Sequence, residues 1–256
     1  MDKRGKGKII QSVQRSLDII NCFNENDIEL SLQEISQRLE LNKSTVHGIL
    51  NTLHVNRFIQ QNENGNYMLG QALFNKSIYA IRATKTKLRS VSKGYMVRLS
   101  NKYKCSSHIF TVESNKLHFL DMTTPVNSYY IISTVLNDLM HLYCTASGKI
   151  LLSYISVNAR NEYLEHADFE KYTDYTLTSK KEILENVNQI VENGYSMEIE
   201  EVEEGCISIA VPVFTKHSDL FGTLSVTGSK EKISGKEVEI IDDLKEISNK
   251  ITNEIF

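Results

Sequence analysis

Apolar residues recur every three or four positions near the start of the chain, the spacing that predicts amphipathic helices. The first helix is expected at 11–23, where one side is formed by Val13, Leu17, Ile20 and Phe23. A second helix is expected after Ser31, because Ser31 and Glu34 form the Ser-x-x-Glu pattern of a capping box. Its core-facing residues would be Leu32, Ile35 and Leu39.

A third helix follows and combines an apolar stripe with a polar face. Asn42 is expected to cap it through its side-chain oxygen, and the stripe consists of Val46, Ile49, Leu50 and Leu53. The other face has mostly short hydrogen-bonding side chains and no acid: Lys43, Ser44, Thr45, His47, Gly48, Asn51, Thr52 and His54. Two helices joined by a tight turn, the second with such a face, are typical of a helix-turn-helix whose second helix enters a DNA major groove.

Two short segments, 58–61 and 67–69, bracket a loop that contains Asn-Gly. They predict a β-hairpin, which would be the wing of a winged helix-turn-helix. A helical pattern then runs from Gln71 to about Tyr103. We place the domain boundary within it and expect a DNA-binding domain at 9–70, a helical connector at 71–90 and a second domain at 91–256.

The second domain is predicted to be α+β, because strand patterns occur in two runs with helices between them. β-branched and aromatic residues predict strands at 106–112, 117–122, 129–135, 196–201, 206–214 and 220–227. Helices are expected at 145–156, 180–192 and 234–255, the last with one side formed by Val238, Ile241, Leu244, Ile247 and Ile251. This order of elements favours one largely antiparallel sheet.

Composition and charge narrow the class of protein. With 256 residues, 41% of them apolar and 24% charged, the chain is long enough for one or two ordinary globular domains. Residues 1–90 contain 13 Lys and Arg against 8 Asp and Glu, whereas residues 91–256 contain 16 against 24. The positive excess at the start indicates that only the first domain meets polyanions.

The compartment is inferred from what the chain lacks. No segment resembles a secretory signal or an apolar membrane span, so we expect a cytoplasmic protein with no membrane partner. The four cysteines are scattered, which favours reduced, packed thiols: Cys22, Cys105, Cys144 and Cys206. The basic residues at 3–8 are interpreted as a solubilising tail, with an arm on DNA as the alternative.

Several ordered motifs resemble those of the IclR family of transcriptional regulators, over nearly the whole chain. In the first domain they are QSVQRSLDII at 11–20, LNKSTVH at 41–47 and YMLG at 67–70. In the second domain they are TASGKILL at 145–152, GY at 194–195, EE at 200–201, Gly205, AVPV at 210–213 and LSVTG at 224–228. The resemblance implies a winged helix-turn-helix, a connecting helix and a GAF-like effector-binding domain. It further implies a homodimer or dimer of dimers on a palindromic double-stranded DNA operator, and a small organic effector, frequently a carboxylate or an aromatic acid.

The resemblance also implies which residues bind the effector: Tyr129, Met140, Thr145, Ala146, Ser147, Glu198, Cys206, Ser208, Ser225 and Thr227. Three positions depart from the family pattern. Tyr143 stands where many relatives have His, Glu198 where they have Asp, and Ser208 where a Cys is common. On the third helix Gly48 replaces a frequent Arg, so this chain is expected to have its own base preference.

The residues expected to contact DNA lie on the third helix or just after it: Lys43, Ser44, Thr45, His47, Asn51, Thr52 and Arg57. Asn51 is a candidate reader of adenine, because an Asn amide can pair with adenine in the major groove. The alternative is a solvent-exposed Asn51 without a base contact. Arg57 and the hairpin would position the domain on the DNA backbone.

Polar residues of the second domain allow a functional and a structural interpretation. Residues 145–149 would begin a helix, where the free N–H groups and the dipole favour an anion such as a carboxylate; a simple N-cap by Thr145 is the alternative. Ser225 and Thr227 alternate on a strand and therefore share one face, which meets either a ligand or solvent. One acidic run consists of Glu198, Glu200, Glu201, Glu203 and Glu204. Most of this run is interpreted as a solvated edge, and only Glu198 is taken as a site residue.

Two other classes of function stay open. A metal- or redox-sensing regulator could use His141 with Cys144, or His108 with His118, although no second ligand pair has zinc spacing. An enzyme with an accessory winged helix is the other alternative. No Gly-x-Ser-x-Gly elbow or nucleophile-base set is present, and Ile150 stands where a P-loop requires Ser or Thr. We therefore expect no catalytic residues, no metal ligands and no cofactor.

Overall fold

A computed structural model describes residues 9–24, 26–126 and 141–256. It divides into two compact units, Met1–Ala83 and Thr84–Phe256. The strand expected at 129–135 lies outside the described residues, as do Tyr129, Met140 and the basic residues at 3–8. None of the helices in the described parts is long and apolar enough to cross a membrane.

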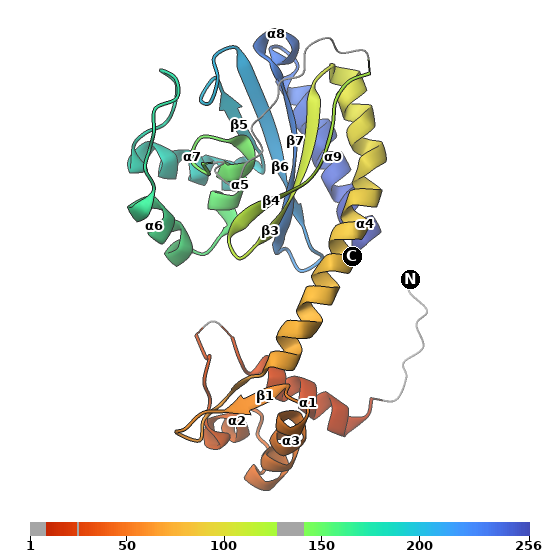
Figure 1. Cartoon of the computed structure of the whole chain (residues 1–256), viewed down its shortest axis with the longest axis vertical. Helices are drawn as coiled ribbons and strands as arrows, with labels where there is room; N and C mark the ends of the chain where they lie inside the picture. The colour runs from red at the N-terminus through yellow and green to blue at the C-terminus, as the bar shows by residue number, and fades with distance from the viewer. Residues whose placement is uncertain (1–8, 25, 127–140) are drawn as a thin grey trace. The chain divides into compact units, whose positions relative to one another are not determined.

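The first unit is a helical domain with a short hairpin, as the sequence predicted (Figure 1). Its elements are α1 (Gln11–Asn21), α2 (Leu32–Arg38), α3 (Lys43–Val55), β1 (Ile59–Gln61), β2 (Tyr67–Leu69) and the first turns of α4 (Gln71–Tyr103). β1 and β2 pair antiparallel, and Leu30 forms an isolated bridge with Tyr67. Apolar side chains from all three helices and the hairpin form one core, which includes Ile19, Phe23, Leu30, Ile35, Val46, Leu50, Ile59 and Tyr67.

Helix capping in this unit agrees with the sequence at one position and differs at another. The Ser31 N–H donates to Glu34 Oε2 at 2.7 Å and the Glu34 N–H donates to Ser31 Oγ at 3.2 Å, which is the predicted capping box. Asn42 does occupy the N-cap position of α3, but its side chain makes no capping hydrogen bond. The prediction of the boundary was therefore confirmed and that of the contact was wrong.

The buried side of α1 also differs from the prediction. Val13 and Leu17 are 55% and 50% exposed, whereas Ile19, outside the predicted stripe, is fully buried. The hydrophobic pattern marks residues that avoid water in the functional assembly, so it cannot separate a core-facing stripe from one that another molecule covers. An apolar stripe therefore remains on the surface of α1.

The second unit is built on a five-stranded antiparallel sheet among the described residues, in the order β4-β3-β7-β6-β5. Its strands are β3 (Ser106–Glu113), β4 (Lys116–Thr123), β5 (Ser196–Ile199), β6 (Cys206–Phe214) and β7 (Leu220–Ser229). Ser114 and Asn115 join β3 to β4, and both have positive φ, the backbone that a tight two-residue hairpin requires. The predicted α+β class with an antiparallel sheet is confirmed.

Helices cover both faces of this sheet (Figure 1). One face packs against α4 and α9 (Glu237–Ile255), and the other carries α5 (Ala146–Tyr154), α6 (Val157–His166) and α7 (Lys180–Asn193), while a short α8 (Lys230–Ile233) follows β7. The larger core lies under α4 and α9 and is aliphatic, with members that include Leu99, Ile109, Val211, Leu224, Leu244 and Ile251. The opposite face is polar along the central strands, and this difference sets the candidate site.

Some helix details were wrong or missing in the prediction. On α9 the stripe was confirmed at Ile241, Leu244, Ile247 and Ile251, which are buried, but Val238 is exposed and Ile240, which was not predicted, is fully buried. Neither α6 nor α8 was predicted. Only Leu164 of α6 is buried, so this helix offers no repeating apolar pattern to recognise.

Candidate functional site

The exposed face of α3 and the turn that follows it present the residues predicted to meet DNA. Six of the seven are exposed and the other, Thr45, is half-buried: Lys43, Ser44, Thr45, His47, Asn51, Thr52 and Arg57. Val46 and Leu50 hold the opposite face in the core of the first unit. A Cβ placed on Gly48 would meet nothing within 4 Å, so the centre of this face is open. A base edge can therefore approach the backbone of α3 closely at Gly48.

Two of these polar side chains already have partners in the protein. Thr52 Oγ1 donates to the Gly48 carbonyl oxygen at 3.1 Å, a common bond of Thr within a helix. Lys43 Nζ donates to Gln33 Oε1 at 3.3 Å, which links the start of α3 to α2. Asn51 lies one turn after His47 on the same exposed face. The geometry leaves Asn51 and His47 better placed than Thr52 to read bases.

In the second unit, the strand register aligns polar residues in two rows on the sheet face that carries α5. The Glu198 row consists of directly opposed residues on four strands: Ser106, Thr227, Ser208 and Glu198. The His108 row is the next one on the same face: Met122, His108, Ser225, Ala210 and Ser196. Because opposed residues point to the same side of a sheet, these side chains share one buried surface, here called the polar face.

The first turn of α5 lies against this polar face. Ala146 and Ile150 share a buried cluster with Ala210 of the His108 row. Thr145 caps the helix, since its Oγ1 accepts from the Gly148 N–H at 3.1 Å and donates to the His141 carbonyl oxygen at 3.2 Å. A Cβ on Gly148 would lie 2.5 Å from Leu142 Cα, so only glycine fits there. The capping alternative is thus present in the structure, and the positive end of the helix dipole lies at this first turn, beside the polar face.

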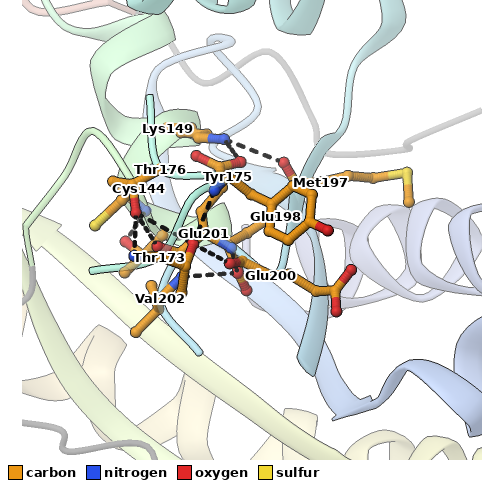
Figure 2. Close-up of polar contacts among 12 residues, drawn as sticks. Cys144, Lys149, Thr173, Tyr175, Thr176, Met197, Glu198, Glu200, Glu201 and Val202 are labelled. Carbon is orange, nitrogen blue, oxygen red and sulfur yellow. Dashed lines mark hydrogen bonds and ion pairs between the residues drawn. The ribbon is translucent and has the colours of Figure 1, made fainter. Parts of the chain in front are cut away.

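Glu198 is a buried carboxyl group at the end of the Glu198 row and is 3% exposed. Its Oε1 accepts from the Glu201 N–H at 2.7 Å and from the Val202 N–H at 3.2 Å, so it holds the turn after β5 (Figure 2). Burial raises the pKa of Glu198 to about 6, although the two backbone N–H donors oppose the shift. The side chain therefore combines a structural role with a position on the polar face.

A Glu198→Gln variant is expected to change how stability depends on pH. Folding favours the protonated form of Glu198, so wild type has its full stability below about pH 4.5 and loses some as pH rises through about 6. Raising the pKa from 4.5 to about 6 corresponds to ~2 kcal/mol, and Gln does not titrate. The free energy of unfolding of Glu198→Gln, measured with urea relative to wild type, should therefore rise by ~2 kcal/mol between pH 4 and pH 7.5. Glu203→Gln, in the exposed part of the same loop, is the control, and parallel curves for wild type and Glu198→Gln would contradict the assignment.

Next to Glu198 lies a buried ion pair between Lys149 of α5 and Glu201 (Figure 2). Lys149 is 1% exposed, and its Nζ also donates to the Met197 carbonyl oxygen at 3.4 Å. Thr176 Oγ1 donates to the Glu201 carbonyl oxygen at 2.6 Å and fixes the same loop from the other side. The interpretation of this acidic run as a solvated edge was wrong for Glu200 and Glu201, which are buried, whereas Glu203 and Glu204 are exposed.

The positions of the histidines and the burial of the cysteines speak against the metal- and redox-sensing alternative. His108 is opposed to Met122 and His118 to Thr111, which places the two histidines on opposite faces of the sheet, where they cannot share a metal ion. Within the described residues, no three His, Cys, Asp or Glu side chains form a group that could hold a metal. Burial raises the pKa of Cys144 to about 12 and of Cys206 to about 11, while reactive cysteines have a lowered pKa.

The structure thus brings together seven of the ten residues predicted for effector binding: Thr145, Ala146, Ser147, Glu198, Ser208, Ser225 and Thr227. Cys206 is half-buried at the start of β6, opposite Ser229 and two residues before Ser208, and the other two residues are outside the described parts. Ser106 and His108 share the polar face but were not predicted as site residues. The alternation of the strand at 106–112 could have placed both with Ser225, once the pairing of β3 with β7 was known.

Comparison with known proteins identifies both units. A family model described as IclR helix-turn-helix domain matches residues 12–63, and one described as bacterial transcriptional regulator IclR C-terminal matches residues 81–253. The chain is 30% identical over 231 residues to the HTH-type transcriptional regulator XynR of Escherichia coli, covering 90% of each chain.

Solved structures have the same fold. The IclR of Thermotoga maritima matches with a TM-score of 0.59 and 21% identity, covering 96% of this chain and 98% of that one. An IclR homolog from Microbacterium hydrocarbonoxydans, solved in complex with 4-hydroxybenzoate, matches with a TM-score of 0.60 and 19% identity over 95% of this chain and 98% of that one.

Proposed function

The chain belongs to the IclR family of bacterial transcriptional regulators, with a helix-turn-helix DNA-binding domain and a C-terminal effector domain, and we propose that it controls transcription from a palindromic operator in response to a small organic acid. The family assignment confirms the resemblance seen in the sequence motifs. The observation that supports DNA reading by this chain is the acid-free, exposed face of α3. In a dimer, the α3 helix of each copy would contact one half-site, and the two half-sites would lie roughly 34–36 Å apart.

We propose that the polar face binds the effector, with its carboxylate at the start of α5. The first turn of α5 supplies the positive end of the helix dipole, and the two rows supply hydroxyl groups for the rest of the molecule. The relative from Microbacterium that was solved with 4-hydroxybenzoate supports a small carboxylic acid as the effector. An enzyme is the less favoured candidate, because the curated relatives are named as regulators.

The decisive experiment is footprinting of the DNA upstream of the gene, with and without a panel of carboxylic acids. The proposal expects two protected half-sites related by two-fold symmetry, and an acid that changes the affinity saturably. It also expects the same acid to raise the melting temperature of the protein without being consumed. Turnover of the acid together with the absence of any protected site would favour the enzyme.

The apolar stripe on α1 supports a dimer formed through the first unit. Ile10, Val13 and Leu17 are exposed at helical spacing, and α4 exposes a second stripe of Phe74, Ile78 and Ile81. Contiguous exposed apolar residues of this kind mark surfaces that a partner covers. A symmetric dimer uses one patch twice, which matches the two-fold symmetry of a palindrome.

The variant Val13→Asp/Leu17→Asp is therefore expected to be largely monomeric at concentrations where wild type is dimeric. Placing four charges in a dimer interface that had been apolar costs several kcal/mol, enough to raise the dissociation constant by about 100-fold or more. Sedimentation velocity over a range of protein concentrations measures this directly. The control is Ser12→Asp/Gln14→Asp, which adds the same charge to neighbouring exposed positions of α1. A double variant that sediments like wild type would show that another surface forms the dimer.

A further inference from the structure

His108 is a buried group with no assigned role in the polar face, between Met122 of β4 and Ser225 of β7. It is 2% exposed, and its Nε2 has no hydrogen-bond partner among the described residues. Thr223 Oγ1, two residues from Ser225 on the neighbouring strand β7, is likewise buried without a partner there. A buried polar atom without a partner is unfavourable, and a bound molecule is one way to supply that partner.

The register fixes how far His108 lies from the start of α5. Ala210 shares a buried cluster with Ala146 and Ile150, Ser225 is directly opposite Ala210, and His108 is directly opposite Ser225. Neighbouring strands are about 4.8 Å apart, so Ser225 lies roughly 5 Å and His108 roughly 10 Å from Ala210 along the row. A molecule that begins at the first turn of α5 and extends by one to two strand spacings along the row would therefore reach from Ser225 to His108.

The charge of His108 decides which group it can recognise. Burial lowers the pKa of His108 to about 4, so the imidazole is neutral at physiological pH. A neutral imidazole offers one donor and one acceptor, and a carboxylate, which only accepts, can use the donor alone. A hydroxyl group can use either nitrogen, because it both donates and accepts, and Ser225 beside it offers the same chemistry.

We propose that His108, together with Ser225, recognises a hydroxyl group at the end of the effector that is remote from its carboxylate. The effector is then a hydroxylated carboxylic acid whose two polar ends are separated by up to two strand spacings. This inference rests on the proposed effector site and adds the chemical feature that selects the ligand. Two kinds of molecule have a hydroxyl group remote from a carboxylate: a polyhydroxylated aliphatic acid and a hydroxylated aromatic acid.

The test compares matched acids that differ only in hydroxylation, using the full chain. Gluconate is paired with hexanoate and 4-hydroxybenzoate with benzoate, and binding is measured by calorimetry and by the shift in melting temperature. The hydroxylated member of at least one pair should bind about 10- to 100-fold more tightly, the cost of leaving a buried polar group unpaired. The pair that responds identifies the source as aliphatic or aromatic.

Variants then assign the preference to His108. In His108→Leu the preference for the hydroxylated acid should fall below about threefold, and His108→Gln should restore part of it because an amide can again meet a hydroxyl. Ser107→Ala is the matched control, since Ser107 is the neighbouring residue of β3, is equally buried and faces the other side of the sheet. If His108→Leu does not fold, Ser225→Ala should show the same loss of preference.

The outcomes separate this inference from the proposed function. Acids that bind and alter operator affinity without any preference for hydroxylation, or a preference that survives in His108→Leu, would overturn the role of His108 and leave the effector site standing. If none of the four acids binds at 10 mM while the operator footprint is present, both the effector proposal and this inference fail.

Discussion

A variant carrying Lys43→Ala and Asn51→Ala is expected to lose specific binding to its operator while it still folds. Both side chains lie on the exposed face of α3, so their removal leaves the core of the first unit intact. A base contact from Asn is worth ~1–3 kcal/mol and a phosphate contact from Lys adds a salt-dependent term. Because each change occurs twice in the proposed dimer, the affinity for specific DNA should fall by about 100-fold or more.

Gel shifts and footprinting with the upstream DNA measure this effect at two salt concentrations. The residual binding of the double variant should be independent of sequence, and its affinity should fall less steeply with salt than that of wild type. The matched control is Lys181→Ala/Asn161→Ala, which removes the same two residue types from exposed positions of α7 and α6. A double variant that still protects the same half-sites would show that α3 is not the recognition helix.

The first unit could be predicted well because its signals are local. The Ser31 capping box, the Asn-Gly hairpin and the stripe behind α3 each depend on residues only a few positions apart. What failed was the direction of α1. The exposure of Val13 and Leu17 depends on what surrounds the domain, and an apolar stripe has the same spacing whether it meets a core or a second chain.

The second unit shows where local signals are insufficient. Lys149 and Glu201 are 52 positions apart, and nothing in the neighbouring sequence indicates that either charge is buried. His108 joined the site only through the pairing of β3 with β7, which connects strands that are more than a hundred residues apart. The fold class follows from the order of elements, but the residues of the site follow from the strand register. That register cannot be predicted from the sequence of a single chain.

The buried ion pair changes how an acidic effector could be held. Lys149 is a buried cation in α5, but Glu201 neutralises its charge. Glu198 adds a second carboxyl group nearby. An anion on the polar face is therefore expected to depend on the dipole and N–H groups of α5 and on neutral hydroxyl groups, not on Lys149. Lys149 is therefore expected to stabilise the fold and not to bind the effector.

Lys149→Met is accordingly expected to destabilise the second unit by ~3–5 kcal/mol, the usual cost of leaving one member of a buried ion pair unpaired. Glu201 Oε2 already has no partner among the described residues, so removal of Lys149 leaves the whole carboxylate without a counter-charge. Burial raises the pKa of Glu201 even with Lys149 present. In the variant the pKa should rise further, so the loss of stability should become smaller as pH falls and Glu201 is protonated.

Urea unfolding at pH 7 measures the loss, and two variants locate its cause. Lys149→Met/Glu201→Leu removes both charges and keeps the apolar volume, so it should recover most of the stability, because a buried pair gains little over a well-packed apolar one. Lys181→Met, on the exposed side of α7, should change the free energy of unfolding by less than ~0.5 kcal/mol. A loss below ~1 kcal/mol for Lys149→Met would mean that water reaches Glu201 in solution, and that the site beside α5 is wetter than its packing indicates.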